Sequence, residues 1–220
     1  GKGFGELSLL YDCPRTATCL PSTRSDLIVI KKKIYNTFVK DLHEKELFDL
    51  VNFYSDIPIF KKESISNILK LCLKTNKKSL LSYNPLHKVG DYINDYYFVL
   101  SGSLKALIKI KMSKFLIKQF KFLSKEEFIH SVKKLQDKEL SSDIYFEVVS
   151  IMEYMPGDMV CEYYAARQHK LNVYLLPTQP TKVLMVKVDD CKKMSPQIHD
   201  LIFKYSIPIF NIDSVLLRLY

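Results

Sequence analysis

The sequence lacks the features by which several classes of protein are recognised. Its five cysteines are far apart and include no Cys-x-x-Cys pair, and its five histidines are equally dispersed. A disulfide framework and a metal site are therefore not expected, and unpaired cysteines suit a reducing compartment. No run approaches the roughly 18 apolar residues of a membrane span, and the first residues do not resemble a signal peptide. We therefore expect a cytoplasmic protein with no membrane span.

Catalytic motifs are also missing. The sequence contains no protein-kinase catalytic motif, no cluster of metal ligands, no nucleophile triad and no helix-turn-helix pattern. We therefore expect a chain that is not an enzyme, holds no cofactor and binds no nucleic acid. Its 220 residues suffice for one large domain or two small ones, and its apolar fraction of 47% is ordinary for a globular protein.

The net charge of +9 is concentrated in one region. Residues 105–138 hold ten lysines, three acidic residues and no arginine, a surplus of seven positive charges. The phenylalanines among them are Phe115, Phe120, Phe122 and Phe128. This pattern can stack the bases of a nucleic acid, but we favour phenylalanines that face a core and lysines that are solvated. A protein or an acidic lipid fits the charge equally well, and we expect a protein partner.

The most informative stretch is residues 4–18, with the sequence FGELSLLYDCPRTAT. Gly5 lets the backbone approach a ligand closely, and residues 7–10 can form one helical turn whose first N–H groups have no partner within it. A proline ends the turn, and Arg15 follows with a planar fork that matches phosphate oxygens. Glu6 only accepts hydrogen bonds and therefore suits a sugar hydroxyl. A phosphate donor beside a hydroxyl acceptor indicates a nucleotide.

These fifteen positions resemble the phosphate-binding cassette of the cyclic nucleotide-binding domain family, as found in cAMP- and cGMP-dependent protein kinases. The resemblance implies that Glu6 holds the ribose 2′-hydroxyl and that Arg15 holds the exocyclic phosphate oxygens. It also implies that Gly5 and three backbone N–H groups complete the cradle, those of Leu7, Ser8 and Ala17. The fold that it implies is α+β, a β-roll or jelly-roll barrel flanked by helices.

Thr16 bears on which nucleotide is bound. The family has alanine there in many cAMP receptors and threonine or serine in many cGMP receptors. The Thr16 hydroxyl could bridge the phosphate and the guanine amino group, which allows cGMP and leaves cAMP open. Glu6 and Arg15 could instead pair with each other across an empty site. We favour a ligand, because a pocket without one has no physical reason to hold both charges.

The resemblance predicts two tandem copies of this fold, the first truncated at its N-terminus. Residues 1–54 would be the C-terminal part of a first domain: the cassette, a strand over residues 27–31, and closing helices within residues 34–54, where apolar residues recur at helical spacing. In the family, barrel strands precede the cassette. We therefore expect that a longer chain supplies these strands or that the sequence is a fragment.

Residues 55–220 form the second predicted domain. A helix with Ile65, Ile68 and Leu73 among its apolar positions is followed by β-rich runs over residues 79–110, which again resemble the barrel of the family. A basic helical insertion around residues 111–142 interrupts this barrel. Ser124 and Glu127 form a capping-box pattern there, so we predict an exposed helix over residues 125–138 that packs by an apolar stripe.

The second domain departs from the cassette of the family. Glu162 is present, but Cys161 replaces the glycine and Leu171 stands at the position of the arginine. Arg167 lies too close to the glutamate to take its place. A charge-assisted hydrogen bond contributes about 1.5–3 kcal/mol, so the loss of the phosphate contacts is severe. We predict that the second domain binds no cyclic nucleotide.

The C-terminal region repeats an earlier phrase. Residues 205–210, YSIPIF, match residues 54–60, YSDIPIF, with one residue deleted. In tandem members of the family this phrase joins the last helix of one domain to the next domain. We expect it to cap the second domain here.

The sequence therefore predicts a regulatory sensor. cAMP or cGMP would bind the first cassette, and the helices that follow would repack and transmit the change. The alternative is a structural or interaction scaffold that keeps the fold and binds no nucleotide.

Overall fold

The computed structural model of the chain describes residues 3–10, 14–15, 17–119, 122–138, 141–209, 213 and 215–216. The helices are α1 (Leu7–Leu10), α2 (Lys32–Phe38), α3 (Lys40–Asp56), the 3-10 turn η1 (Pro58–Phe60), α4 (Ile65–Lys74), α5 (Lys114–Gln119), α6 (Lys125–Gln136), α7 (Glu162–Arg167), α8 (Val188–Met194) and α9 (Pro196–Tyr205). The strands are β1 (Asn76–Leu80), β2 (Asp95–Ser101), β3 (Leu104–Ser113), β4 (Ile144–Tyr154), β5 (Met159–Val160), β6 (Tyr174–Pro177) and β7 (Thr181–Lys187). Among the described residues, no helix is long and apolar enough to cross a bilayer.

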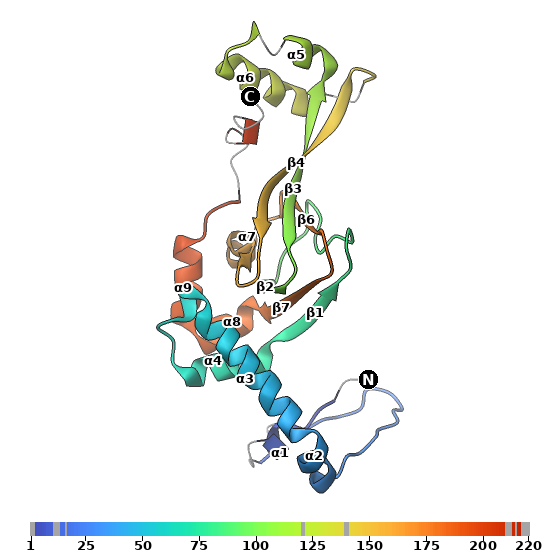
Figure 1. Cartoon of the computed structure of the whole chain (residues 1–220), viewed down its shortest axis with the longest axis vertical. Helices are drawn as coiled ribbons and strands as arrows, with labels where there is room; N and C mark the ends of the chain where they lie inside the picture. The colour runs from blue at the N-terminus through green and yellow to red at the C-terminus, as the bar shows by residue number, and fades with distance from the viewer. Residues whose placement is uncertain are drawn as a thin grey trace.

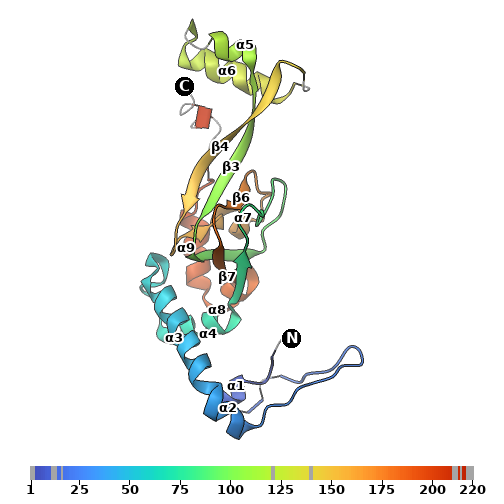
Figure 2. The ribbon, with the colours of Figure 1, turned by 45° about the vertical axis from the view of Figure 1, so that its right-hand side comes forward.

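The strands form two antiparallel sheets in the middle of an elongated molecule (Figure 1). The strand order is β1-β7-β2-β5 in one sheet and β4-β3-β6 in the other. Helices α3, α4, α8 and α9 lie at one end of the sheets, and α5 and α6 lie at the far end of the β3–β4 hairpin (Figures 1 and 2). The predicted α+β fold, a β-barrel flanked by helices, is confirmed at this level.

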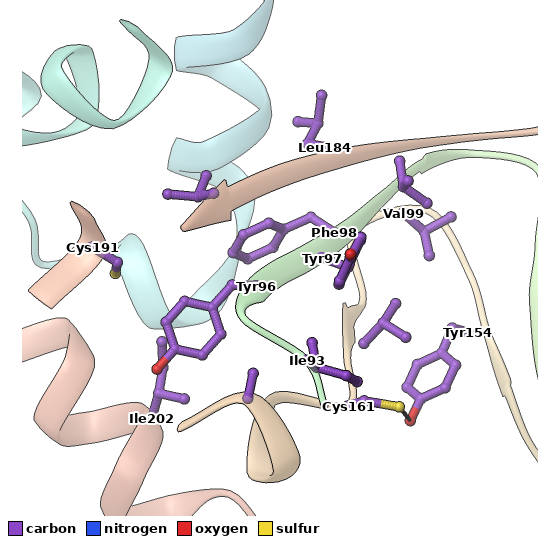
Figure 3. Close-up of a cluster of buried hydrophobic side chains, with 14 of the residues drawn as sticks. Ile93, Tyr96, Tyr97, Phe98, Val99, Tyr154, Cys161, Leu184, Cys191 and Ile202 are labelled. Atoms are coloured by element: carbon purple, nitrogen blue, oxygen red, sulfur yellow. Dashed lines mark hydrogen bonds between the residues drawn. The ribbon is translucent and has the colours of Figure 1, made fainter. Parts of the chain in front are cut away.

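The main core is built around β2, because β2 lies between β7 and β5. Successive side chains of a strand point to opposite faces, and Figure 3 shows Tyr96 and Phe98 on one side of β2 and Val99 on the other. Phe98 meets Tyr54 of α3 edge to face, with ring centroids 5.3 Å apart. Tyr54 meets Phe60 of η1 in the same way at 5.4 Å. These aromatic contacts fasten α3 and η1 to the sheet.

The helices predicted within residues 34–54 are present, with one break. Helix α2 ends at Phe38 and α3 begins at Lys40, so Val39 separates two helices. Helix α3 ends at Asp56 because Ile57, which precedes a proline, has extended backbone with ψ of 126°. Pro58 then begins η1 at the first position, where its missing N–H is not needed.

Helix α4 confirms the predicted amphipathic helix and is capped by Ser64. The Ser64 Oγ accepts the backbone N–H of Asn67 at 3.3 Å. Ile68 is buried against the main core, whereas Ile65 and Leu73 are 68% and 42% exposed. Only part of the predicted apolar set therefore packs.

The strand predicted over residues 27–31 is wrong. All of these residues are described and none is in a strand, and Ile28 and Val29 are 97% and 82% exposed. A strand depends on backbone hydrogen bonds to a neighbour, and the strands of this structure pair with one another elsewhere. Local β propensity alone does not stabilise an unpaired strand.

The predicted insertion is an extension of a hairpin. Strands β3 and β4 pair as far as Ser113 opposite Ile144, and α5 and α6 follow at the end of this hairpin. The capping box of α6 is confirmed, because Ser124 and Glu127 each accept the other's backbone N–H. The helix ends at Gln136, two residues before its predicted end. It packs on the hairpin end and not on the barrel.

A separate hydrophobic cluster, here called the tip cluster, stabilises this hairpin end. Its buried members are Ile110, Met112, Leu116, Phe128, Val132, Leu135, Val215 and Leu216. Of the phenylalanines expected to face a core, Phe128 does so, but Phe115 and Phe122 are 62% and 85% exposed. Phe120 lies outside the described residues. The prediction of inward phenylalanines is therefore wrong for two of the four positions.

The repeated phrase is packed differently in its two occurrences. Tyr54, Ile57 and Phe60 are buried in the main core. Tyr205 and Ile207 are 66% and 75% exposed, and Phe210 lies outside the described residues. The described residues of the second phrase are therefore much less buried than the corresponding residues of the first.

Candidate functional site

The candidate nucleotide site in residues 4–18 begins at Gly5. The φ of Gly5 is +85°, in the left-handed region that glycine adopts without strain. A Cβ at this position would lie 3.1 Å from Nη1 of Arg15. Gly5 therefore permits both the turn of the backbone and the close approach of the arginine.

Glu6 stands at the entrance to a single helical turn. Its carbonyl oxygen accepts the N–H of Leu9 at 2.9 Å, and α1 begins at Leu7, as predicted. The Glu6 side chain is partly buried. Ser8 Oγ donates to the carbonyl oxygen of Gly5 at 3.1 Å, which closes the turn on itself. The Glu6 carboxylate, which can only accept hydrogen bonds, is therefore held beside this turn.

Arg15 returns to the start of the same turn. Its Nη1 donates to the carbonyl oxygen of Gly5 and to Ser8 Oγ. Within the described part of the chain, Arg15 forms no ion pair with Glu6, so the two charges do not neutralise each other directly. The side chain of Arg15 is exposed, and a guanidinium carries five N–H donors in a planar fork. This arrangement places an anion-binding group beside the carboxylate.

The other predicted site residues are less defined. Ala17 is exposed, and Thr16 lies outside the described residues. Helix α1 packs beside α2, so the candidate site adjoins the first closing helix. The structure thus brings Gly5, Ser8 and Arg15 together next to Glu6.

The second segment, residues 160–171, starts with the same backbone shape. Cys161 has a φ of +55°, which is uncommon for a residue with a side chain, and it precedes Glu162 at the start of α7. The Cys161 thiol is buried, and its Sγ lies 3.8 Å from the Tyr154 hydroxyl (Figure 3). Burial raises the pKa of this thiol well above its usual range, so it stays protonated.

Glu162 occupies a less polar environment than an exposed glutamate. Burial is the main cause that raises the pKa of its carboxyl, and the charge of Asp158 acts in the same direction. Leu171, at the position of the expected arginine, is 1% exposed within the main core. The second segment therefore has a carboxyl group that is costly to ionise and an apolar side chain where a cation is needed.

Arg167 serves a different purpose from Arg15. Its Nη1 donates to Ser206 Oγ at 2.7 Å, and its Nη2 donates to the carbonyl oxygen of Phe203. The guanidinium also lies over the rings of Tyr163 and Phe203, 4.5 Å and 4.4 Å from their centroids. These contacts fix α7 to α9. The sequence did not predict them, because Ser206 lies 39 residues further along the chain.

Sequence comparisons identify kinase relatives. No family model matches the chain. It is 26% identical over 191 residues to a cGMP-dependent protein kinase of Eimeria tenella, a match that covers 83% of this chain and 18% of the relative. It is 22% identical over 102 residues to the cAMP-dependent protein kinase regulatory subunit of Mycosarcoma maydis, covering 46% of this chain and 19% of the relative. The chain thus spans less than a fifth of the length of these relatives.

Structural comparisons show a similar fold in two solved regulatory proteins. The regulatory domain of Toxoplasma gondii PKA, solved with cAMP, superposes with a TM-score of 0.63 at 18% identity, over 91% of this chain and 65% of that one. The regulatory subunit of a cAMP-independent protein kinase A from Trypanosoma cruzi, bound to guanosine, superposes with a TM-score of 0.55 at 12% identity, over 98% of this chain and 66% of that one. At these identities the likeness concerns the fold.

Proposed function

We propose that this chain is a member of the cyclic nucleotide-binding domain family, similar to the regulatory domains of cAMP- and cGMP-dependent protein kinases. We further propose that it is a non-catalytic regulatory module that binds a cyclic nucleotide. The site is the cassette of residues 4–18, and the ligand is cAMP or cGMP. Residues 1–54 belong to a first domain and residues 55–220 to a second, in which the segment at Glu162 binds no nucleotide.

The observation that supports this proposal is the position of Arg15. Its guanidinium meets Gly5 and Ser8 at the start of the turn that Glu6 opens. A cyclic phosphate carries one negative charge and a ribose offers a hydroxyl, so one fork-shaped donor and one acceptor-only side chain match both groups. Gly5 leaves room for the arginine, and the polar groups converge within a few residues.

A bound ligand has a short route to the second domain. Helix α1 packs beside α2, α2 leads into α3, and Tyr54 of α3 contacts Phe98 at the centre of the barrel. Glu46 of α3 also pairs with Lys77 of β1 at 3.6 Å. A nucleotide that binds one arrangement of α2 and α3 more tightly shifts the population toward it, and the barrel then experiences the change.

The test is a calorimetric titration of cAMP and cGMP into the natural protein that contains these residues. We expect saturable binding at one site per chain. Arg15→Lys keeps the charge and loses the planar fork, so the affinity falls by roughly 10- to 100-fold. Arg24→Lys, an exposed arginine outside the cassette, is the matched control and leaves affinity unchanged. Binding that Arg15→Lys leaves intact would exclude Arg15 as the phosphate anchor.

A titration with guanosine distinguishes a site that recognises a nucleotide from one that recognises a nucleoside, and both from a scaffold that binds neither. The Trypanosoma cruzi relative is cAMP-independent and is bound to guanosine, which has no phosphate. If this chain binds guanosine and Arg15→Lys leaves that affinity unchanged, the site recognises a nucleoside. If a folded protein gives no heat with cAMP, cGMP or guanosine, the chain is a scaffold that keeps the fold.

A further inference from the structure

The end of the β3–β4 hairpin exposes apolar and basic side chains together. Phe115 and Phe122 are 62% and 85% exposed, and Ile117 is 46% exposed. The lysines around them, Lys114, Lys118 and Lys125, are exposed as well. These six residues are here called the tip patch. Helices α5 and α6, which contain or flank these residues, lie at the end of the molecule opposite α1 and α2 (Figures 1 and 2).

Helix α5 sorts its residues into a buried and an exposed side. An α-helix turns by about 100° per residue, so Lys114, Phe115, Ile117 and Lys118 form one continuous arc, and Leu116 lies opposite. Leu116 is buried in the tip cluster. Around this exposed arc, Lys114 and Lys118 are adjacent and lie between Ile117 and Phe115.

The exposed arc is held firmly in place. Ser113 Oγ accepts the backbone N–H groups of Phe115 and Leu116 at 3.1 and 3.4 Å, and it donates to Asp143 Oδ2 at 2.8 Å. Leu116 packs with Phe128 and Val132 in the tip cluster. Neither Phe115 nor Phe122 is among the described members of that cluster, so packing among the described residues does not explain why these two side chains lie at the surface.

The composition of the tip patch indicates what kind of surface it contacts. Residues 114–125 contain four lysines, three phenylalanines and no acidic residue. Lysine is depleted in protein–protein interfaces, where arginine is enriched, and residues 105–138 contain no arginine. Clustered lysines beside exposed aromatic and aliphatic side chains are typical of segments that lie on anionic membrane surfaces. A bilayer also needs no shape complementarity, which suits side chains that protrude from the end of a hairpin.

We propose that the tip patch docks the protein onto an anionic membrane surface, with Phe115, Ile117 and Phe122 in the headgroup region and the lysines on lipid phosphates and carboxylates. This contact is peripheral and reversible, and it is independent of the nucleotide site. A protein with an acidic surface is the competing partner that the experiment must separate from lipid.

The test is flotation of the 220-residue chain with vesicles of phosphatidylcholine, alone or with about 30% phosphatidylserine, at about 0.1 M salt. We expect binding only to the anionic vesicles and weaker binding as salt rises. The double variant Lys114→Gln/Lys118→Gln lowers partitioning by roughly 25-fold, since each lysine contributes on the order of fivefold. Lys192→Gln/Lys193→Gln, an exposed pair on α8, is the matched control and changes it little.

A fluorescence experiment tests which side chains meet the lipid. The chain has no tryptophan, so Phe122→Trp gives a signal from this position alone. We expect its emission to shift to the blue with anionic vesicles and to stay unchanged with phosphatidylcholine. Vesicle binding without this shift would overturn the assignment of Phe122. Binding of poly-glutamate with no binding of anionic vesicles would overturn the proposal and assign the patch to an acidic protein partner.

Discussion

In residues 4–18 and in residues 160–171, a residue with positive φ precedes a glutamate that opens a short helix. The residue is Gly5 in the first segment and Cys161 in the second. The arginines that follow diverge: Arg15 returns to the turn, whereas Arg167 reaches away to α9. The backbone shape therefore persists without glycine, and the position of the arginine separates a candidate ligand site from a structural contact.

The repeated phrase shows the opposite distribution. In the phrase of residues 54–60, which follows the exposed first segment along the chain, Tyr54 is fully buried and its hydroxyl lies 3.0 Å from Thr75 Oγ1. In the phrase of residues 205–210, which follows the buried second segment along the chain, Tyr205 is largely exposed. The same residue types therefore pack or protrude according to the surface that they meet, which for Tyr54 is Phe60 and Phe98.

Alanine substitutions of Tyr54 and Tyr205 test this contrast directly. Tyr54→Ala leaves a cavity between α3, η1 and β2, so it lowers the free energy of unfolding by about 4 kcal/mol. Tyr205→Ala removes an exposed ring and changes it by less than about 0.5 kcal/mol. Urea denaturation of both variants measures the difference. Equal losses would show that the second phrase is packed as firmly as the first.

The two arginines provide the next comparison. Arg167→Ala removes two charge-assisted hydrogen bonds and the stacking on Tyr163 and Phe203, so it lowers the free energy of unfolding by about 2 kcal/mol. Arg15→Ala acts on an exposed side chain, and we expect a change within about 0.5 kcal/mol. Thermal unfolding followed by circular dichroism checks both values. A larger loss for Arg15→Ala would assign it a structural role and weaken the proposed ligand site.

The smallest effect concerns the glutamate of the second segment. Because burial raises the pKa of Glu162 in the folded protein, the folded state holds this proton more tightly and loses stability as the pH rises above the ordinary glutamate value of 4.5. Glu162→Gln removes this loss. We expect it to stabilise the protein at pH 7, by less than the losses expected for Tyr54→Ala and Arg167→Ala, and to have little effect below about pH 4.

The pH profile of unfolding for the wild type and Glu162→Gln measures this difference. A variant that is less stable than the wild type at pH 7 would contradict the assignment and indicate a favourable partner for the charged carboxylate.

The corresponding change in the first segment is Glu6→Gln, which is measured by nucleotide titration. We expect a lower affinity, because the variant loses a hydrogen-bond acceptor for the ribose.

Local features of the fold were predictable from the sequence, and long-range ones were not. The capping box at Ser124, the turn after Glu6 and the end of α3 before Pro58 each depend on neighbouring residues, and each is present. The strand over residues 27–31 is absent because strand formation depends on a distant partner. The burial of a side chain likewise depends on tertiary contacts, so the exposure of Phe115 was not predictable from its spacing.

The candidate site and its counterpart in the second segment show the same difference between local features, which the sequence predicts, and long-range contacts, which it does not. The positions of Gly5, Glu6 and α1 follow from the order of residues in a single turn. The contact of Arg167 with Ser206 does not, because it joins α7 to the residue after α9. A residue whose partner lies far along the chain carries no local signal of its role.

The inclusion of Val215 and Leu216 in the tip cluster has a mechanical consequence. The chain is fastened to Arg167 through Ser206 and to the hairpin end through Val215. The nine residue steps from Ser206 to Val215 span at most about 30 Å when fully extended. This covalent connection limits how far the hairpin end and α9 can move apart.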